Sequence, residues 1–142
     1  MDQTNSPVVD CASDSTIFAR IRALIIDDEA HVRSYVRLTL QSLGVATTWE
    51  AADGGTGLAL YAEQTPDVVF LDVNMPTMPG SDTMEQLLQI DPDANVVIIT
   101  SDSAHQTVRK FLELGAIGYV LKQRPPEEFR SALYELLSQF AE

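Results

Sequence analysis

The chain has 142 residues, of which 45% are hydrophobic, a size and composition that fit one domain with a real core and leave little room for a second. Its formal net charge of -12 argues against nucleic acid and anionic membrane surfaces as direct partners, since both attract clustered lysine and arginine. The single cysteine excludes an internal disulfide and a cysteine-based zinc site. No stretch approaches the roughly 20 apolar residues of a membrane span, and the N-terminus lacks the features of a signal peptide, so we expect a cytoplasmic protein.

The first segment of the chain differs in composition from the rest. Residues 1–19 are polar and carry no periodic apolar face, which predicts a disordered N-terminal extension. Cys11 lies in this segment, and we interpret it as incidental. The domain is therefore expected to span residues 20–142.

From Arg20 onward, short apolar runs alternate with helical patterns. Near-continuous apolar runs are typical of strands that are covered on both faces of a sheet. The predicted strands are, in chain order, Ala23–Ile26, Thr47–Ala51, Val68–Leu71, Val96–Ile99 and Tyr119–Leu121. The pattern is weakest in the second, which contains Trp49.

Apolar residues at helical spacing predict a helix after each strand. The five helices are marked by Val32, Val36, Leu40 and Leu43; by Leu58, Tyr61 and Ala62; by Met84, Leu87 and Leu88; by Val108, Phe111 and Leu112; and by Phe129, Leu133, Leu136, Leu137 and Phe140. Gly44 and Gly115 follow two of them as expected C-terminal glycines, and Pro125 and Pro126 open the last. A strand followed by a helix, five times over, predicts a parallel sheet with right-handed crossovers and helices on both faces.

Polar side chains stand at the carboxyl ends of the predicted strands, where open α/β sheets bind their ligands. They are Asp27, Asp28, Asp72, Thr100 and Lys122. Three carboxylates brought together repel one another unless a cation offsets the repulsion, and their hard oxygen atoms suit Mg²⁺. A lysine can contact a phosphoryl group, and a threonine hydroxyl can donate to one. The set predicts a site that receives a phosphoryl group on Asp72 through positioning and charge neutralisation.

These residues lie in motifs that resemble those of a known family. The motifs are Ile25–Glu29, Pro66–Pro76, Gly80, Ile98–Ser101 and Gly115–Lys122. From about Arg22 to Phe140 the chain resembles the receiver domain of bacterial two-component response regulators, of the stand-alone, chemotaxis-regulator-like kind. The resemblance implies an α/β, flavodoxin-like, doubly wound sheet of five parallel strands, (βα)5, in the order 2-1-3-4-5.

The resemblance also implies the roles of the acidic residues. Asp72 would be the phosphoacceptor. Asp28 and Asp72 would ligate Mg²⁺, or Mn²⁺ in its place, with Asp27 acting mainly through water. The backbone carbonyl of Asn74 would complete the protein's metal ligands.

The remaining site residues would contact the phosphoryl group or respond to it. Thr100, Lys122 and Ser101 would contact its oxygen atoms, and Tyr119 would be a switch residue that follows the movement of Thr100. Asn74 and Asp102, each two residues beyond a site residue, would tune the lifetime of the phosphoryl group.

One motif departs from the family's pattern. The family usually has a cis proline after the lysine of the fifth strand, whereas Lys122 is followed by Gln123. A cis bond before a residue other than proline costs about 2.5–4 kcal/mol, so we expect a trans bond and a different loop into the fifth helix.

The resemblance implies protein partners rather than substrate turnover, so we do not expect an enzyme. The phosphoryl group would come from a sensor histidine kinase or a histidine phosphotransfer protein. The output would be a contact with a downstream protein, or with a second phosphorylated copy, through Tyr119 and neighbours such as Arg109 and Arg130.

Two other functions stay open. A pseudo-receiver would keep the fold and bind a partner without phosphorylation. The altered loop after Lys122 mildly favours this interpretation, and the intact set of Asp27, Asp28, Asp72, Thr100 and Lys122 argues against it. A Mg²⁺-dependent phosphohydrolase of the haloacid dehalogenase type would need a second acid two residues after the nucleophile, where this chain has Asn74. Quenching of Trp49 fluorescence by Mg²⁺ would support a metal site if that ring lies near the carboxylates.

Overall fold

Five parallel strands form one sheet in the computed structural model, which describes residues 17–76, 78–101 and 105–140. The strands lie in the order β2-β1-β3-β4-β5, so the predicted order is confirmed. Their bounds are β1 Arg22–Ile26, β2 Thr47–Ala51, β3 Val68–Asp72, β4 Val96–Thr100 and β5 Gly118–Leu121. Each strand contains the run that predicts it, and the predicted Asp72 and Thr100 are the last residues of their strands.

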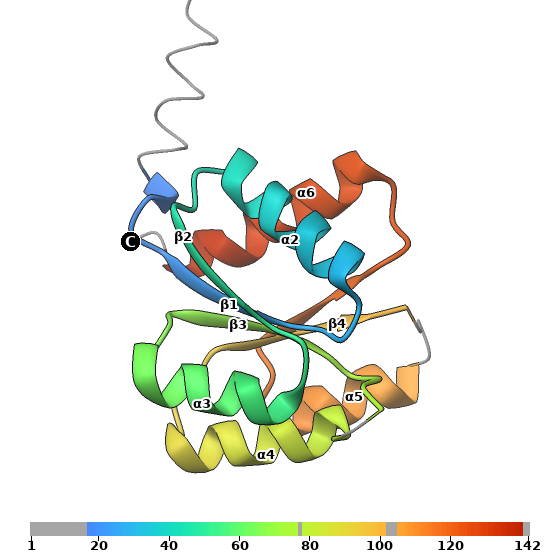
Figure 1. Ribbon diagram of the computed structural model, residues 1–142. Helices are drawn as coiled ribbons and strands as arrows, with labels where there is room; N and C mark the ends of the chain where they lie inside the picture. Colours follow the sequence, from blue (N-terminus) through green and yellow to red (C-terminus); the bar gives the residue numbers. More distant parts are fainter. Residues whose placement is uncertain (1–16, 77, 102–104, 141–142) are drawn as a thin grey trace, which may run out of the picture.

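The helices lie in two layers, one on each side of the sheet. Their bounds are α2 Ala30–Ser42, α3 Gly54–Gln64, α4 Gly80–Ile90, α5 His105–Leu114 and α6 Pro126–Leu137, followed by the 3-10 turn η1 Ser138–Phe140. Helices α2 and α6 cover one face, and α3, α4 and α5 cover the other (Figure 1). The doubly wound α/β fold is therefore confirmed. Within the described residues, no helix is both long enough and apolar enough to cross a bilayer.

The helix ends follow from the residues that the sequence places there. Gly44 and Gly115 have φ angles of 106° and 124°, a left-handed conformation that glycine adopts without steric cost. Pro126 is the first residue of α6, where its missing N–H leaves no hydrogen bond unmade. Gly80 is required for a different reason, because a Cβ there would lie 2.7 Å from the Cα of Val73, in the backbone that follows β3.

Alternation along the strands divides the core into two clusters. Ile25, Phe70, Ile99 and Val120 pack in the cluster beneath α2 and α6, whereas their neighbours in sequence pack on the side of α3, α4 and α5. The same alternation continues past the strand ends. It directs Asp27, Asp72 and Lys122 to the α2–α6 side, and Thr100 and Tyr119 to the α5 side.

The structure describes the chain from residue 17 onward, three residues before the predicted start of the domain. Phe18 is 1% exposed, belongs to the core cluster beneath α2 and α6, and meets Tyr134 of α6 edge-on with ring centroids 5.3 Å apart. Phe18 therefore packs with the domain, although the predicted boundary at residue 19 places it in the N-terminal extension. Residues 1–16, including Cys11, lie outside the described residues.

Candidate functional site

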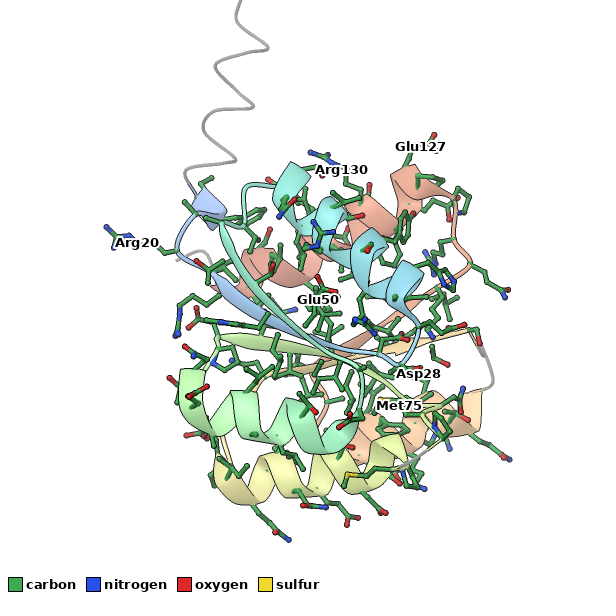
Figure 2. All side chains as sticks on the ribbon, viewed as in Figure 1. Arg20, Asp28, Glu50, Met75, Glu127 and Arg130 are labelled. Atoms are coloured by element: carbon green, nitrogen blue, oxygen red, sulfur yellow. The ribbon has the colours of Figure 1, made fainter. Side chains whose placement is uncertain are left out.

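Three carboxylates meet at the carboxyl edge of the sheet. Asp72 ends β3, and Asp27 and Asp28 follow β1 directly. Each offers one oxygen atom, and these atoms all lie within 4.8 Å of one another. Asp27 and Asp72 are buried, with exposures of 0% and 1%, whereas Asp28 is exposed. In Figure 2, Asp28 and Met75 mark this edge from the β1 and β3 sides.

The two buried carboxylates are only partly hydrogen bonded. The N–H of Glu29 donates to Oδ1 of Asp27 at 2.8 Å, and the N–H of Asn74 donates to Oδ1 of Asp72 at 3.2 Å. Within the described part of the chain, Oδ2 of each aspartate is buried without a hydrogen-bond donor. Buried polar atoms without a partner are rare, and oxygen atoms of this kind suit a hard divalent cation. The donor set therefore fits the predicted Mg²⁺ ligands.

Lys122 supplies the positive charge at this edge. Its Nζ lies 3.1 Å from Oδ2 of Asp27, 3.3 Å from Oδ1 of Asp72 and 3.2 Å from Oε1 of Glu29. The first of these is an ion pair without hydrogen-bond geometry, which is why Oδ2 of Asp27 still lacks a donor. Burial alone would lower the pKa of Lys122, but the three carboxylates outweigh it and raise that pKa.

The charge on Asp72 is destabilised by its surroundings. Burial first, and repulsion by Asp27 second, raise its pKa from 3.8 to about 6. The N–H of Asn74 and the charge of Lys122 oppose this shift without cancelling it. A divalent cation would relieve the same repulsion, so the pKa of Asp72 and the donor geometry point to the same requirement.

The predicted hydroxyl groups occupy different environments. Thr100 is fully buried at the end of β4, and its carbonyl accepts a hydrogen bond from the N–H of Lys122 at 2.9 Å. Ser101 is exposed and lines a cavity of about 370 Å³ together with Lys122 and Gln123. Asn74 is exposed beside Asp72, and Asp102 lies outside the described residues.

The three residues named for the predicted contact surface lie on two different parts of the protein. The Tyr119 ring is 43% exposed and lies on the α5 side of the sheet, and Arg109 of α5 is exposed as well. Arg130 instead donates to Oγ and the backbone carbonyl of Ser42, at 3.2 and 3.3 Å. It is exposed as well and lies at the contact between α6 and α2, where Figure 2 shows it, so its place in the contact surface stays a prediction.

The loop after β5 agrees with the departure seen in the sequence. Among the described residues no peptide bond is cis, so the predicted trans bond between Lys122 and Gln123 is confirmed. Gln123 lies in the wall of the cavity beside Lys122.

Sequence reasoning missed two residues that act on this edge. Glu29 pairs with Lys122, and Arg33 donates from Nη1 to the carbonyl of Asp27 at 2.8 Å while its Nε reaches Glu50 at 3.2 Å. The acid beside Asp27 and Asp28 was visible in the sequence, but its partner lies 93 residues away. Arg33 lies one turn into α2 and carries no motif that marks it.

Trp49 lies in the middle of β2, where it pairs with Leu24 of β1. The guanidinium of Arg22, the first residue of β1, stacks over it at 5.0 Å from the ring centroid. Asp27 lies three residues beyond Leu24, about 10 Å further along at the usual rise of a strand. Quenching of Trp49 by Mg²⁺ therefore stays a prediction.

Comparison with known proteins gives the same result as the geometry. Residues 23–134 match the sequence model of the response regulator receiver domain. The chemotaxis protein CheY of Thermotoga maritima is 30% identical over 112 residues, which cover 79% of this chain and 93% of that protein. The nitrate/nitrite response regulator protein NarL of Escherichia coli is 32% identical over 113 residues, which cover 79% of this chain and 52% of NarL.

Solved structures show the same relationship. A chain in the crystal structure of the CheX-CheY-BeF3-Mg²⁺ complex from Borrelia burgdorferi superposes with a TM-score of 0.77 at 26% identity, over 84% of this chain and 89% of that one. Sheet order, the acidic edge and the sequence match all lead to one assignment. The chain belongs to the response regulator receiver domains of two-component systems.

Proposed function

We propose that this receiver accepts a phosphoryl group on Asp72 in a Mg²⁺-dependent reaction and signals through a protein contact. The observation that carries the proposal is the cluster of three carboxylates within 4.8 Å, two of them buried with an oxygen atom that lacks a donor. A structural role would favour hydrogen-bonded carboxylates, because an unpaired buried charge destabilises the fold.

The residues divide the chemistry between them. A carboxylate oxygen of Asp72 would form a bond to phosphorus while the bond from phosphorus to the donor breaks and the donor leaves with that electron pair. Asp27, Asp28, Asp72 and the carbonyl of Asn74 would hold Mg²⁺, which supplies neutralisation of negative charge when it is bound. Lys122 would contact the phosphoryl oxygens, and the Thr100 hydroxyl would donate to them from the buried end of β4.

The partners follow from this role. We propose that a sensor histidine kinase or a histidine phosphotransfer protein is the donor, and that the protein works in the cytoplasm without turning over a separate substrate. The output would pass through Thr100 to Tyr119, since both side chains lie on the α5 side of the sheet. The related complex that contains CheX, CheY, BeF3 and Mg²⁺ supports a receiver that binds a protein in the presence of a phosphoryl analogue.

Intact mass spectrometry tests the proposal directly. The protein is incubated with Mg²⁺ and a small-molecule phosphodonor, beside Asp72→Asn and beside a sample with a chelator in place of Mg²⁺. We expect one added phosphate in the unmodified protein and none in either control. No adduct, together with no Mg²⁺-dependent binding of beryllofluoride, would favour the pseudo-receiver.

A further inference from the structure

Lys122 has three carboxylate partners, and one of them stands outside the proposed metal site. Asp27 and Asp72 belong to the metal cluster, but Glu29 does not. Oε1 of Glu29 nevertheless lies 3.2 Å from Nζ of Lys122, as close as the two buried aspartates. The Glu29 side chain is 48% exposed, whereas Asp27 and Asp72 are enclosed. Glu29 is therefore the partner that Lys122 can exchange most readily.

The position of Glu29 in its helix points the same way. It is the N-cap residue of α2, with φ -95° and ψ 114°, yet its side chain makes no capping hydrogen bond. Serine, threonine, aspartate and asparagine are preferred at N-caps because their side chains accept hydrogen bonds from the free N–H groups of the first turn. The glutamate gives up this local stabilisation and reaches Lys122 instead.

We propose that Glu29 is a positioning residue, which holds the ammonium of Lys122 in the resting protein and releases it to an incoming phosphoryl oxygen. The inference rests on the proposed function. Three carboxylates surround the ammonium group of Lys122, and its Nζ donates a hydrogen bond to Oε1 of Glu29 at 3.2 Å. A phosphoryl oxygen that approaches Nζ competes with these carboxylates, and displacement of Glu29 leaves both buried aspartates in place for the metal ion.

The cavity beside the ion pair gives both side chains room to part. Glu29, Ser101, Lys122 and Gln123 line it, with a volume of about 370 Å³. Glu29 borders both this space and solvent, since its side chain is 48% exposed. The carboxylate therefore competes with the phosphoryl group for Lys122, and its removal should favour the phosphorylated state.

Affinity for beryllofluoride in saturating Mg²⁺, measured by calorimetry, tests the competition. We expect Glu29→Gln to bind beryllofluoride about five-fold more tightly than the unmodified protein, the fold-change that corresponds to the upper range of a partly exposed ion pair. Glu29→Asp keeps the charge, but its shorter side chain falls short of Lys122 and suits the N-cap. It should therefore behave like Glu29→Gln rather than like the unmodified protein.

A matched variant separates the ion pair from a general effect of charge. Asp53 follows β2 at the same sheet edge and caps α3 by accepting from the N–H of Thr56 at 2.7 Å. Asp53→Asn removes one negative charge, keeps a capping side chain, and should leave the affinity for beryllofluoride unchanged. A double-mutant cycle of Glu29→Gln and Lys122→Met on the urea midpoint, without metal, should show that the two residues are coupled.

Several results would overturn the inference. Unchanged or weaker binding in Glu29→Gln would do so, as would equal tightening in Asp53→Asn, unmodified affinity in Glu29→Asp, or additive urea midpoints in the cycle. If the unmodified protein binds no beryllofluoride while the cycle still shows coupling, the proposed function fails. The pair is then purely structural, and the inference falls with it.

Discussion

Polar groups at the amino end of the sheet are hydrogen bonded, whereas those at the carboxyl end are only partly so. At the amino end, Arg22 donates to the carbonyls of Thr65 and Gln64 at 3.0 and 2.5 Å, and its N–H donates to Asp67 at 2.8 Å. The amide of Asn95 reaches the carbonyl of Asp67 at 3.2 Å. The side chains of Arg22 and Asp67 both have partners here, and they tie together the segments that precede β1, β3 and β4.

At the carboxyl end the same strands finish in a surplus of negative charge. Asp27 and Asp72 each keep a buried oxygen without a donor, and Lys122 is shared among three carboxylates. The amino end therefore stabilises the fold, whereas the carboxyl end is destabilised until something binds there. Buried carboxylate oxygens without hydrogen-bond donors are expected at functional sites rather than at structural ones.

Removal of Lys122 should give the largest change in stability. Without metal, Lys122→Met leaves the repulsion between Asp27 and Asp72 uncompensated, and we expect a loss of about 3 kcal/mol in the free energy of unfolding near pH 8. Mg²⁺ should restore most of it, because the ion replaces the missing charge. Urea unfolding with a chelator and with Mg²⁺ measures both values. Equal losses in the two conditions would contradict a shared electrostatic role.

Neutralisation of Asp72 should instead raise the free energy of unfolding of the metal-free protein. Its folded-state pKa of about 6 lies above the ordinary value of 3.8, so the native protein binds more protons than the unfolded chain between these pH values. Stability in the absence of metal should therefore fall as pH rises from about 4 to 6. Asp72→Asn should flatten this slope and stabilise the metal-free protein at pH 8 by about 1–3 kcal/mol.

The same variant carries its own control. Mg²⁺ should stabilise the unmodified protein at pH 8 and have much less effect on Asp72→Asn, because one metal ligand is lost. Thermal unfolding across pH, with and without Mg²⁺, distinguishes the cases. A less stable Asp72→Asn at pH 8 would show that the carboxylate contributes to the fold, as Asp67 does at the other end.

Removal of Arg22 should lower stability at the amino end without affecting metal binding at the carboxyl end. Arg22→Met breaks two hydrogen bonds to loop carbonyls and the stacking over Trp49, and we expect a loss of about 1–2 kcal/mol. The loss should be independent of Mg²⁺, and calorimetric affinity for Mg²⁺ should not change. A change in metal affinity would mean that the strands transmit strain from one end to the other.

The smallest effect is expected from the ion pairs above β2. Glu50 accepts from Arg33 at 3.2 Å and from Arg37 at 3.0 Å, and Figure 2 shows it beneath α2. Glu50→Gln should cost less than about 1 kcal/mol, since partly exposed pairs contribute little. Arg33 keeps its bond to the carbonyl of Asp27, so beryllofluoride binding should be unchanged. Weakened binding would show that Glu50 holds Arg33 in place.

The sequence was sufficient for the architecture and for the residues that meet at its edge. Apolar runs that end in Asp72 and Thr100 mark both the strands and their carboxyl ends, because buried parallel strands leave polar residues only where they emerge. Alternation then places Asp27, Asp72 and Lys122 on one side of the sheet. Hydrophobic patterning along each strand is therefore enough to predict both the strands and the side chains at their ends.

Other features depend on contacts that no local rule describes. The pairing of Glu29 with Lys122 and of Arg130 with Ser42 each joins residues about 90 positions apart, through long side chains with many rotamers. Phe18 is buried against Tyr134 and the core, although no periodic apolar pattern marks the segment before β1. These contacts become visible only once the helices are packed.

The stacking of Trp49 under Arg22 has a practical consequence for spectroscopy. Trp49 is the one tryptophan of the chain, so its emission reports from a single place. That place is the middle of β2, where the ring meets the guanidinium of Arg22. The protein therefore carries one intrinsic fluorophore inside the sheet that follows unfolding. Ligand-induced stabilisation can be read from its transition, and a titration of Mg²⁺ into the folded protein measures any direct quenching.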